Sequence, residues 1–255
     1  MRSRARTALL LLGSYALLPT GCHALGDGRG TLGIFGDRDP RVLYSVDTDQ
    51  PVVALTIDDG PDSESTAEIL SVLAAHDAKA TFFLISSRIP GNEAAVDAIV
   101  AGGHELGNHH ESDSPSIELS HVEFEEQLLA AERALSVWQS PRWFRPASGW
   151  YDDWMLDLLE EHDYRCALGS VYPLDAQIPS VRLAAWWIGR RARPGSVIIL
   201  HDAGGRGERS ARVLERILPE LAARGIEVVT LTELLRRSAS PSGEDLADSI
   251  GKPEA

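Results

Sequence analysis

From about residue 50 the chain alternates between apolar runs and stretches with helical periodicity. The apolar runs, several of them β-branched, read VVALTID, ATFFLIS, RCALGS, SVIILHD and IEVVTL. The spacing between them predicts helices over residues 65–75, 93–101, 120–138, 153–162, 181–192 and 210–223. Continuous apolar strands separated by helices indicate a parallel sheet covered on both faces. Six or so such units favour an α/β fold with a barrel-like (β/α) arrangement, with a doubly wound open sheet as the alternative.

Polar residues follow several of these predicted strands. Asp58 and Asp59 end the first run, His201 ends SVIILHD, and Arg145 follows the short run RWF. In parallel α/β folds the chemistry lies at the carboxyl ends of the strands and on the loops that follow. We therefore expect these side chains to converge on one mouth of the barrel.

The adjacent carboxylates Asp58 and Asp59 repel each other, so a nearby cation, such as a metal ion, would stabilise them. A solvated Asp-Asp-Gly-Pro turn is the alternative. In GGHELGNHHESDSPS, His109 and Asp113 are four residues apart, so on a helical turn they would point the same way. An imidazole and a carboxylate at that spacing can share a metal with Asp59, although a His-Asp pair is more often an ordinary hydrogen bond.

Residues 50–236 resemble the NodB-homology polysaccharide deacetylases, carbohydrate esterase family 4. The resemblance rests on four motifs in the family's order: TIDDGP, GHELGNH followed by an acidic residue, FRPASG and IILHD. It implies a NodB-like distorted (β/α) barrel of about seven units, one divalent metal ion, and hydrolysis of N-acetyl or O-acetyl groups on a polysaccharide or oligosaccharide.

The resemblance also implies catalytic roles. Asp58 corresponds to the general base, Arg145 to the residue that orients it, and His201 to the general acid. The backbone N–H of Ser148 would contribute to the oxyanion hole. The family's fourth motif is barely recognisable in SVYPLDAQIPS, where Asp175 aligns best with the aspartate that tunes the histidine.

By the same resemblance, Asp59, His109 and Asp113 are the metal ligands. The family normally has histidine at the third position, and this chain has Asp113. Two carboxylates and one imidazole cancel the charge of a divalent ion. We therefore predict a zinc ion or, because carboxylate ligands suit harder ions, a relative preference for Co²⁺ or Mn²⁺ over Zn²⁺.

Three residues are candidates for lining the substrate site. Ile199 stands where the family places a leucine in the acetyl pocket. The family's tyrosine in the third motif is absent, and Trp150 and Tyr151 follow closely. Sugar sites favour such flat rings, yet a Trp beside a Tyr is also an ordinary packing pair.

Composition and the ends of the chain bound the setting. The net charge of −14 argues against nucleic acid as a partner. Residues 1–24 combine an arginine-rich start with an apolar stretch too short to span a bilayer, which predicts an export signal. The run LLPTGC resembles a lipobox ending at Cys22, which would attach the protein to a membrane by a lipid. A plain signal cleaved near Ala24 is the alternative.

We expect a linker over residues 25–49, the deacetylase domain over residues 50–236, and a disordered tail over residues 237–255. Cys166 is expected to be a buried, unpaired core residue. The predicted protein is an exported deacetylase that is periplasmic, on the cell surface or secreted. Its candidate substrates are peptidoglycan, chitin-like oligomers or an exopolysaccharide. An O-acetyl esterase and a catalytically silent sugar-binding homologue are the alternatives.

Overall fold

The computed structural model describes residues 39–239. The predicted export signal, Cys22, the start of the linker and most of the tail lie outside these residues. Among the described residues, no helix is long and apolar enough to cross a membrane.

The described residues form one eight-stranded sheet, and every strand pairs in parallel with its neighbours. The order is β1-β6-β5-β4-β3-β2-β7, and β8 pairs with the first half of β2. The strands are β1 (Val42–Leu43), β2 (Val52–Asp58), β3 (Thr81–Leu84), β4 (Glu105–Asn108), β5 (Trp143–Phe144), β6 (Arg165–Ala167), β7 (Val197–His201) and β8 (Glu227–Val229).

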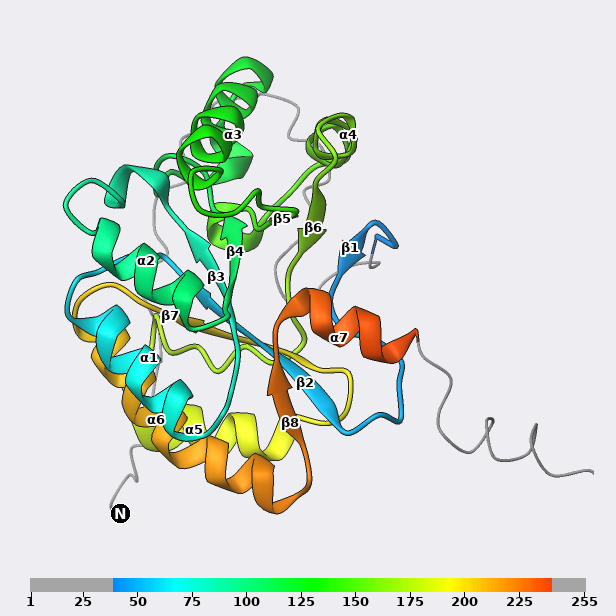
Figure 1. Ribbon diagram of the computed structural model, residues 1–255. Helices are drawn as coiled ribbons and strands as arrows, with labels where there is room; N and C mark the ends of the chain where they lie inside the picture. Colours follow the sequence, from blue (N-terminus) through cyan, green and yellow to red (C-terminus); the bar gives the residue numbers. More distant parts are fainter. Residues whose placement is uncertain (1–38, 240–255) are drawn as a thin grey trace, which may run out of the picture.

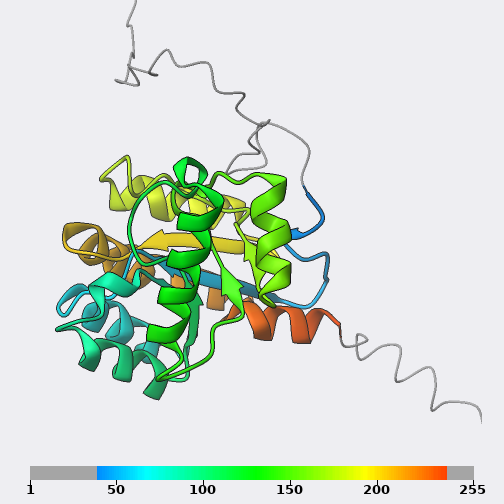
Figure 2. The ribbon, with the colours of Figure 1, turned by 90° about the horizontal axis from the view of Figure 1, so that it is seen from above.

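Helices pack around the outside of the sheet (Figures 1 and 2). Helices α2, α1, α6 and α5 form one consecutive layer, while α3 and α4 pack beside β4 and β6. Their bounds are α1 (Ser65–Ala75), α2 (Glu93–Ala101), α3 (His121–Leu135), α4 (Asp153–Glu161), α5 (Val181–Arg191), α6 (Gly205–Ala223) and α7 (Leu231–Ser238). The six predicted helices are therefore confirmed, two of them with the predicted bounds.

Strand β2 shows how this arrangement positions the site. All seven of its residues are buried. Val53, Leu55 and Ile57 pack in the core beneath the outer helices, whereas Val52 and Ala54 belong to a separate cluster. Because side chains alternate along a strand, Asp58 shares the face of Val52 and Ala54. The strand thus carries a carboxylate at its end, on the face that points away from the outer helices.

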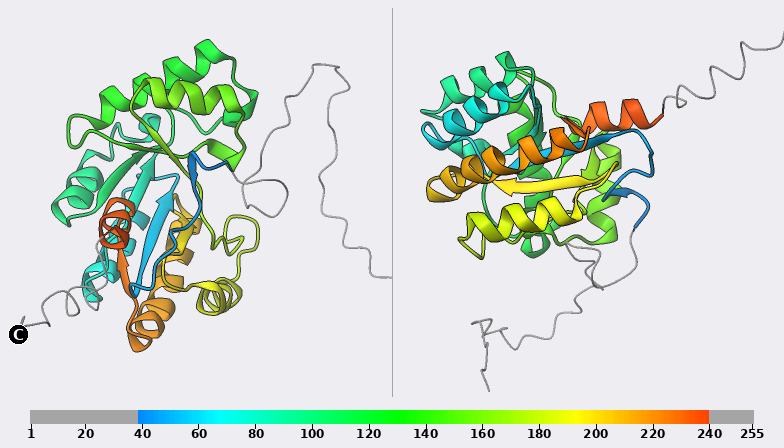
Figure 3. Two further views of the ribbon diagram at one scale, coloured as in Figure 1. Left: turned by 90° about the vertical axis from the view of Figure 1, so that its right-hand side faces the viewer. Right: turned by 90° about the horizontal axis from the view of Figure 1, so that it is seen from below.

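The two edges of the sheet are joined only in part. The described residues connect them through two isolated bridges, Ser45 with Ser196 and Val171 with Ile198. Helix α7, the red helix in Figure 3, follows β8 and packs Leu231 and Leu234 into the cluster that contains Val52 and Ala54. The fold is therefore a distorted (β/α) barrel, as predicted.

Two secondary-structure elements extend past the predicted domain boundaries. Strand β1 lies within the predicted linker and pairs with β6, so the folded domain begins before residue 50. Helix α7 was not predicted, and it continues to Ser238, past the predicted start of the tail. Both elements are short, and a two-residue strand is too short to show a period.

Candidate active site

The carboxyl ends of the strands surround a cavity of about 550 Å³. Asp58 on β2 lies in register with His201 on β7, so these two residues face the cavity from neighbouring strands. The other predicted site residues that line this cavity are Asp59, His109, Asp113, Arg145, Ser148, Trp150 and Ile199. The expected convergence on one mouth is therefore confirmed.

Arg145 holds Asp58 in place. Its Nη1 donates to Asp58 Oδ1 at 2.5 Å and to Thr56 Oγ1 at 2.8 Å. Its Nε and Nη2 donate to the carbonyl oxygens of Ala167 and Leu168, each at 2.9 Å. Both charged side chains are buried, and the guanidinium lies 4.2 Å from the centre of the Phe83 ring. The pairing leaves Asp58 in a fixed orientation at the cavity.

His201 is paired with Asp175. The imidazole Nδ1–H donates to the Asp175 carboxylate oxygens at 3.0 and 3.1 Å, and the His201 backbone N–H donates to the same carboxylate at 3.1 Å. Burial lowers the pKa of His201, but the hydrogen bond and charge of Asp175, together with the charges of Asp58 and Asp59, outweigh burial and raise that pKa above its ordinary value. The other ring nitrogen, Nε2, is then the one that can carry a proton to a bound substrate.

Asp59 and His109 converge at the same cavity. His109 Nδ1–H donates to the carbonyl oxygen of Arg145 at 2.7 Å, and its Nε2 lies 3.5 Å from Asp59 Oδ1. Burial by itself raises the pKa of Asp59. The hydrogen bond and charge of His109, together with the charges of His201 and Arg206, outweigh burial, and the pKa of Asp59 falls below its usual range.

The structure does not bring Asp113 into this pair. The segment after β4 turns at His110, where φ is 66°, and continues through bends without a helical turn. The i, i+4 argument therefore does not apply. Asp113 is half exposed and its Oδ2 accepts from Arg88 Nη2 at 2.9 Å. Among residues 39–239, no three acidic, histidine or cysteine side chains are grouped as a metal site.

Arg206 is a second departure from the predicted metal site. Its Nη1 lies 2.8 Å from Asp59 Oδ2. Asp59 and Asp113 are therefore each paired with a guanidinium, and of the three predicted ligands the structure groups Asp59 with His109 but not with Asp113. In this arrangement, the side chains present do not fit a three-ligand divalent metal site.

His110 does not supply the missing ligand. Its ring packs between Phe124 and Phe144, with ring centres 4.6 and 4.7 Å away. Burial lowers the pKa of His110 to about 3, so the ring is neutral. It belongs to the core and not to the cavity.

The substrate-lining candidates divide into two groups. Trp150 is 42% exposed and lines the cavity together with the buried Ile199. The prediction for Tyr151 is wrong, because this side chain is buried in the core and its hydroxyl lies 2.7 Å from the Tyr44 hydroxyl. Ser148 lines the cavity with a φ of 67°, and its part in an oxyanion hole stays a prediction.

Three residues near the site were not identified from the sequence. Arg206 and Arg88 both follow strand ends, so the rule that located Asp58 and His201 could have found them. Tyr172 also lines the cavity, with its ring centre 5.7 Å from that of His201, and donates to Gln177 Oε1 at 2.5 Å. Its single ring in an irregular segment carries no comparable sequence signal.

Asp202 is structural. It is buried and accepts hydrogen bonds from the hydroxyls of Ser65 and Thr66 at the start of α1. Its backbone N–H also donates to the Asp58 carbonyl oxygen at 2.7 Å. Asp202 thereby holds the first turn of α1 against the ends of β2 and β7. Cys166, as predicted, is buried and unpaired, and burial raises the pKa of its thiol to about 12.

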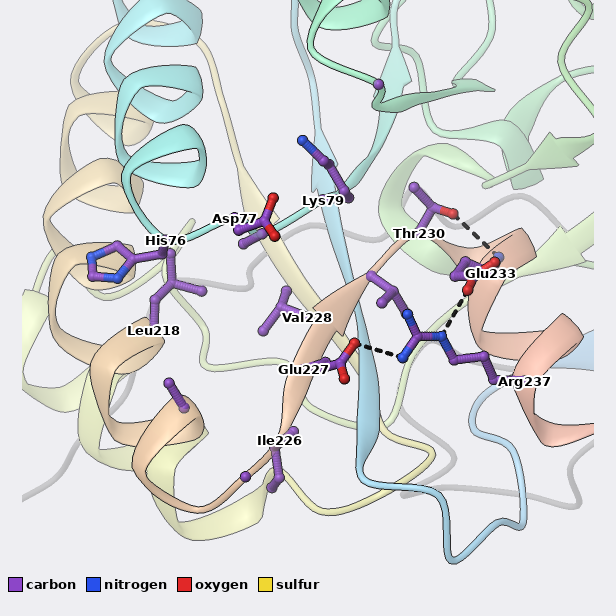
Figure 4. Close-up of a pocket in the computed structure, with 15 residues that line it drawn as sticks. His76, Asp77, Lys79, Leu218, Ile226, Glu227, Val228, Thr230, Glu233 and Arg237 are labelled. Carbon is purple, nitrogen blue, oxygen red and sulfur yellow. Dashed lines mark hydrogen bonds and ion pairs between the residues drawn. The ribbon is translucent and has the colours of Figure 1, made fainter. Parts of the chain in front are cut away.

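A larger cavity, of about 680 Å³, contains none of the motif residues. It lies beside α1, β8 and α7 (Figure 4). Arg237 donates to Glu233 at 2.7 Å and to Glu227 at 2.6 Å, so both of these carboxylates are already paired within the chain. We therefore assign the functional site to the cavity around Asp58.

The Arg145–Asp58 pair yields a stability prediction. Replacing Arg145 by methionine leaves the buried Asp58 without its cation, so we expect the free energy of unfolding to fall by about 3–5 kcal/mol. Urea unfolding at pH 7 measures this free energy for the variant and the wild type. Arg212→Gln is the control, because Arg212 is exposed and its pairing with Glu208 on the same helix contributes little. A loss below about 1 kcal/mol would contradict the prediction.

Comparison with known proteins agrees with the arrangement of the motifs. Residues 45–167 match the polysaccharide deacetylase family. A peptidoglycan-N-acetylglucosamine deacetylase of Bacillus cereus is 32% identical over 198 residues, which are 76% of this chain and 93% of that protein.

Solved structures show the same similarity. The crystal structure of the Bc1960 peptidoglycan N-acetylglucosamine deacetylase has a TM-score of 0.73 at 31% identity, covering 76% of this chain and 92% of that one. BA3943, a CE4 family pseudoenzyme from Bacillus anthracis, has a TM-score of 0.70 at 28% identity, covering 78% of this chain and 70% of that one. Sequence, fold and motif order agree, and the chain belongs to the polysaccharide deacetylase family.

Proposed function

We propose that this polysaccharide deacetylase removes acetyl groups from N-acetylglucosamine residues of a cell-wall polymer, with peptidoglycan as the first candidate. The observation that carries the proposal is that Asp58 and His201 lie on neighbouring strands at one cavity, each held by a partner, Arg145 and Asp175 respectively. The relatives of known substrate support an N-acetylated glycan.

The chemistry assigned to these residues follows from their contacts. Asp58 accepts a proton from water as the water oxygen bonds to the acetyl carbon. His201 then donates a proton to the nitrogen as the carbon–nitrogen bond breaks, which releases acetate and a free amine. Arg145 keeps Asp58 oriented toward the cavity, and Asp175 keeps the proton available on His201. The backbone N–H of Ser148 is the proposed donor to the oxyanion, for which the loss of a donor typically costs about 3 kcal/mol of barrier.

Deacetylases of this family depend in general on a divalent metal ion, which polarises the acetyl carbonyl and acidifies water when bound. The side-chain arrangement described above does not fit such an ion. The predicted preference for Co²⁺ or Mn²⁺ over Zn²⁺ was based on Asp113 as a ligand, and the assay below tests it.

The test is acetate release by the purified protein from peptidoglycan and from N-acetylglucosamine oligomers. The protein is first treated with chelator, and Zn²⁺, Co²⁺ or Mn²⁺ is then added separately. Acetate release from either polymer, lost in Asp58→Asn, supports N-deacetylation. Release only from acetylated xylan would instead support the O-acetyl esterase.

A catalytically silent sugar-binding protein is the second candidate, because Arg206 and Arg88 pair with two of the three predicted metal ligands. A similar fold is known in a pseudoenzyme. Binding of N-acetylglucosamine oligomers without acetate release under any condition would support this candidate.

For the cellular setting we propose export, supported by the arginine-rich and apolar start of the sequence. Mass spectrometry of the protein recovered from its native host distinguishes the two forms of the proposal. A lipid-modified Cys22 indicates a membrane-anchored lipoprotein, and an unmodified chain that begins near Ala24 indicates cleavage and release.

A further inference from the structure

Asp59 already has a cation within the chain. The Asp59 side chain is buried, and a buried carboxylate requires a compensating charge. Arg206 supplies it, with Nη1 2.8 Å from Asp59 Oδ2. His109 lies against the other oxygen, Oδ1, at 3.5 Å. Both carboxylate oxygens are therefore in contact with side chains of this chain.

The turn that places Arg206 follows the catalytic strand directly. After His201 on β7, Ala203 and Gly204 adopt positive φ values of 76° and 54°, and α6 begins at Gly205. This sharp turn puts Arg206 in the first helical turn, beside the cavity. The side chain is about one-third exposed, so it enters the site from the solvent side.

Arg88 adds a second guanidinium at the same place. Its Nη2 donates to Asp113 at 2.9 Å, and its Nη1 donates to the backbone carbonyl oxygen of Asp59. Arg88 therefore holds Asp113 away from His109. A divalent ion on Asp59 would have to displace Arg206 and would lie close to both positive charges, which is unfavourable in a buried site.

We propose that Arg206 takes the place of the divalent ion in this chain. The guanidinium is the resident cation of Asp59, and the protein consequently binds Zn²⁺ and Mn²⁺ weakly. This inference concerns the metal position only and does not depend on which polysaccharide is the substrate.

The experiment measures metal binding directly, by equilibrium dialysis of the chelator-treated full chain against Zn²⁺ or Mn²⁺. Arg206→Gln removes the competing charge, so we expect it to bind at least about tenfold more tightly than the wild type, equivalent to ~1.4 kcal/mol. Arg212→Gln is the matched control, since Arg212 lies on the same helix and pairs with Glu208 outside the cavity. Its affinity should equal that of the wild type.

A second comparison tests whether the metal ion binds at Asp59. Asp113→His supplies the donor that the family normally uses, and we expect its gain in affinity to be much larger with Arg206→Gln than alone. Adding Asp59→Asn to Arg206→Gln should abolish the gain. Thermal unfolding checks that each variant is folded, and Arg206→Met replaces the glutamine variant if that one is not.

Three results would overturn the proposal. The first is equal affinity of the wild type and Arg206→Gln. The second is that Asp113→His alone binds the metal ion as tightly as Asp113→His combined with Arg206→Gln. The third is a gain that survives Asp59→Asn, since the ion would then be bound elsewhere. None of these readouts depends on acetate release, so failure of this proposal is distinguishable from failure of the proposed function.

Discussion

Asp58→Asn is expected to lower the rate of acetate release by about 10²–10⁴-fold, the range typical for loss of a general base. Asparagine has nearly the shape of aspartate and can still accept a hydrogen bond from Arg145, so the cavity should keep its form. The amide nitrogen cannot accept the proton of the attacking water. The measurement is kcat/KM for acetate release from N-acetylglucosamine oligomers.

Oligosaccharide binding and thermal unfolding control for indirect effects of Asp58→Asn. Binding should be retained, because the change leaves the walls formed by Trp150 and Ile199 intact. Asp49→Asn, at an exposed aspartate outside the cavity, should behave like the wild type. Activity within about threefold of the wild type would show that Asp58 is not the base.

His201→Gln is expected to have an effect of similar size, about 10²–10⁴-fold, because the leaving nitrogen would lose its proton donor. An amine is a poorer leaving group without protonation than the alcohol released from an O-acetyl ester. The loss should therefore be greater with an N-acetylated than with an O-acetylated substrate. Equal losses on the two substrates would argue against proton donation to the leaving group.

The pH profile tests the His201–Asp175 pair separately. Asp175 raises the pKa of His201, so the acid form persists to higher pH and kcat/KM falls as pH rises through that pKa. Asp175→Asn lowers the pKa of His201, and the fall should begin at lower pH. Glu215→Gln, which removes an exposed charge on α6, is the control. An unmoved basic limb would show that His201 does not act as the acid.

Much of the fold could be predicted because it is encoded locally. Continuous apolar runs such as VVALTID can form strands buried on both faces, and helical periodicity between them requires outer helices. Placing Asp58 and His201 at strand ends then followed from one rule about parallel sheets. Strand β1 and helix α7 escaped this reasoning, because their formation depends on the surfaces against which they pack.

The structure brings the predicted residues to the cavity where a single strand end determined a position, and it places them elsewhere where a side chain had to be located across a loop. Asp113 is separated from Asp59 by the absence of a helical turn after His109. Tyr151 is adjacent to the cavity-lining Trp150, yet it packs inward against Tyr44. Neighbouring residues commonly face opposite ways, and only packing decides which one faces the ligand.

The sequence by itself determined the parallel α/β architecture, the strand-end positions of Asp58 and His201, and the family to which the motifs belong. Only the tertiary structure decided which cation meets Asp59. Arg206 is distant in the chain and reaches Asp59 because β2 and β7 are adjacent and the turn at Ala203 and Gly204 directs α6 toward the cavity. Periodicity is a property of residues that are close in the sequence. An ion pair between residues that follow two different strands depends on the register of those strands and on the turns after them.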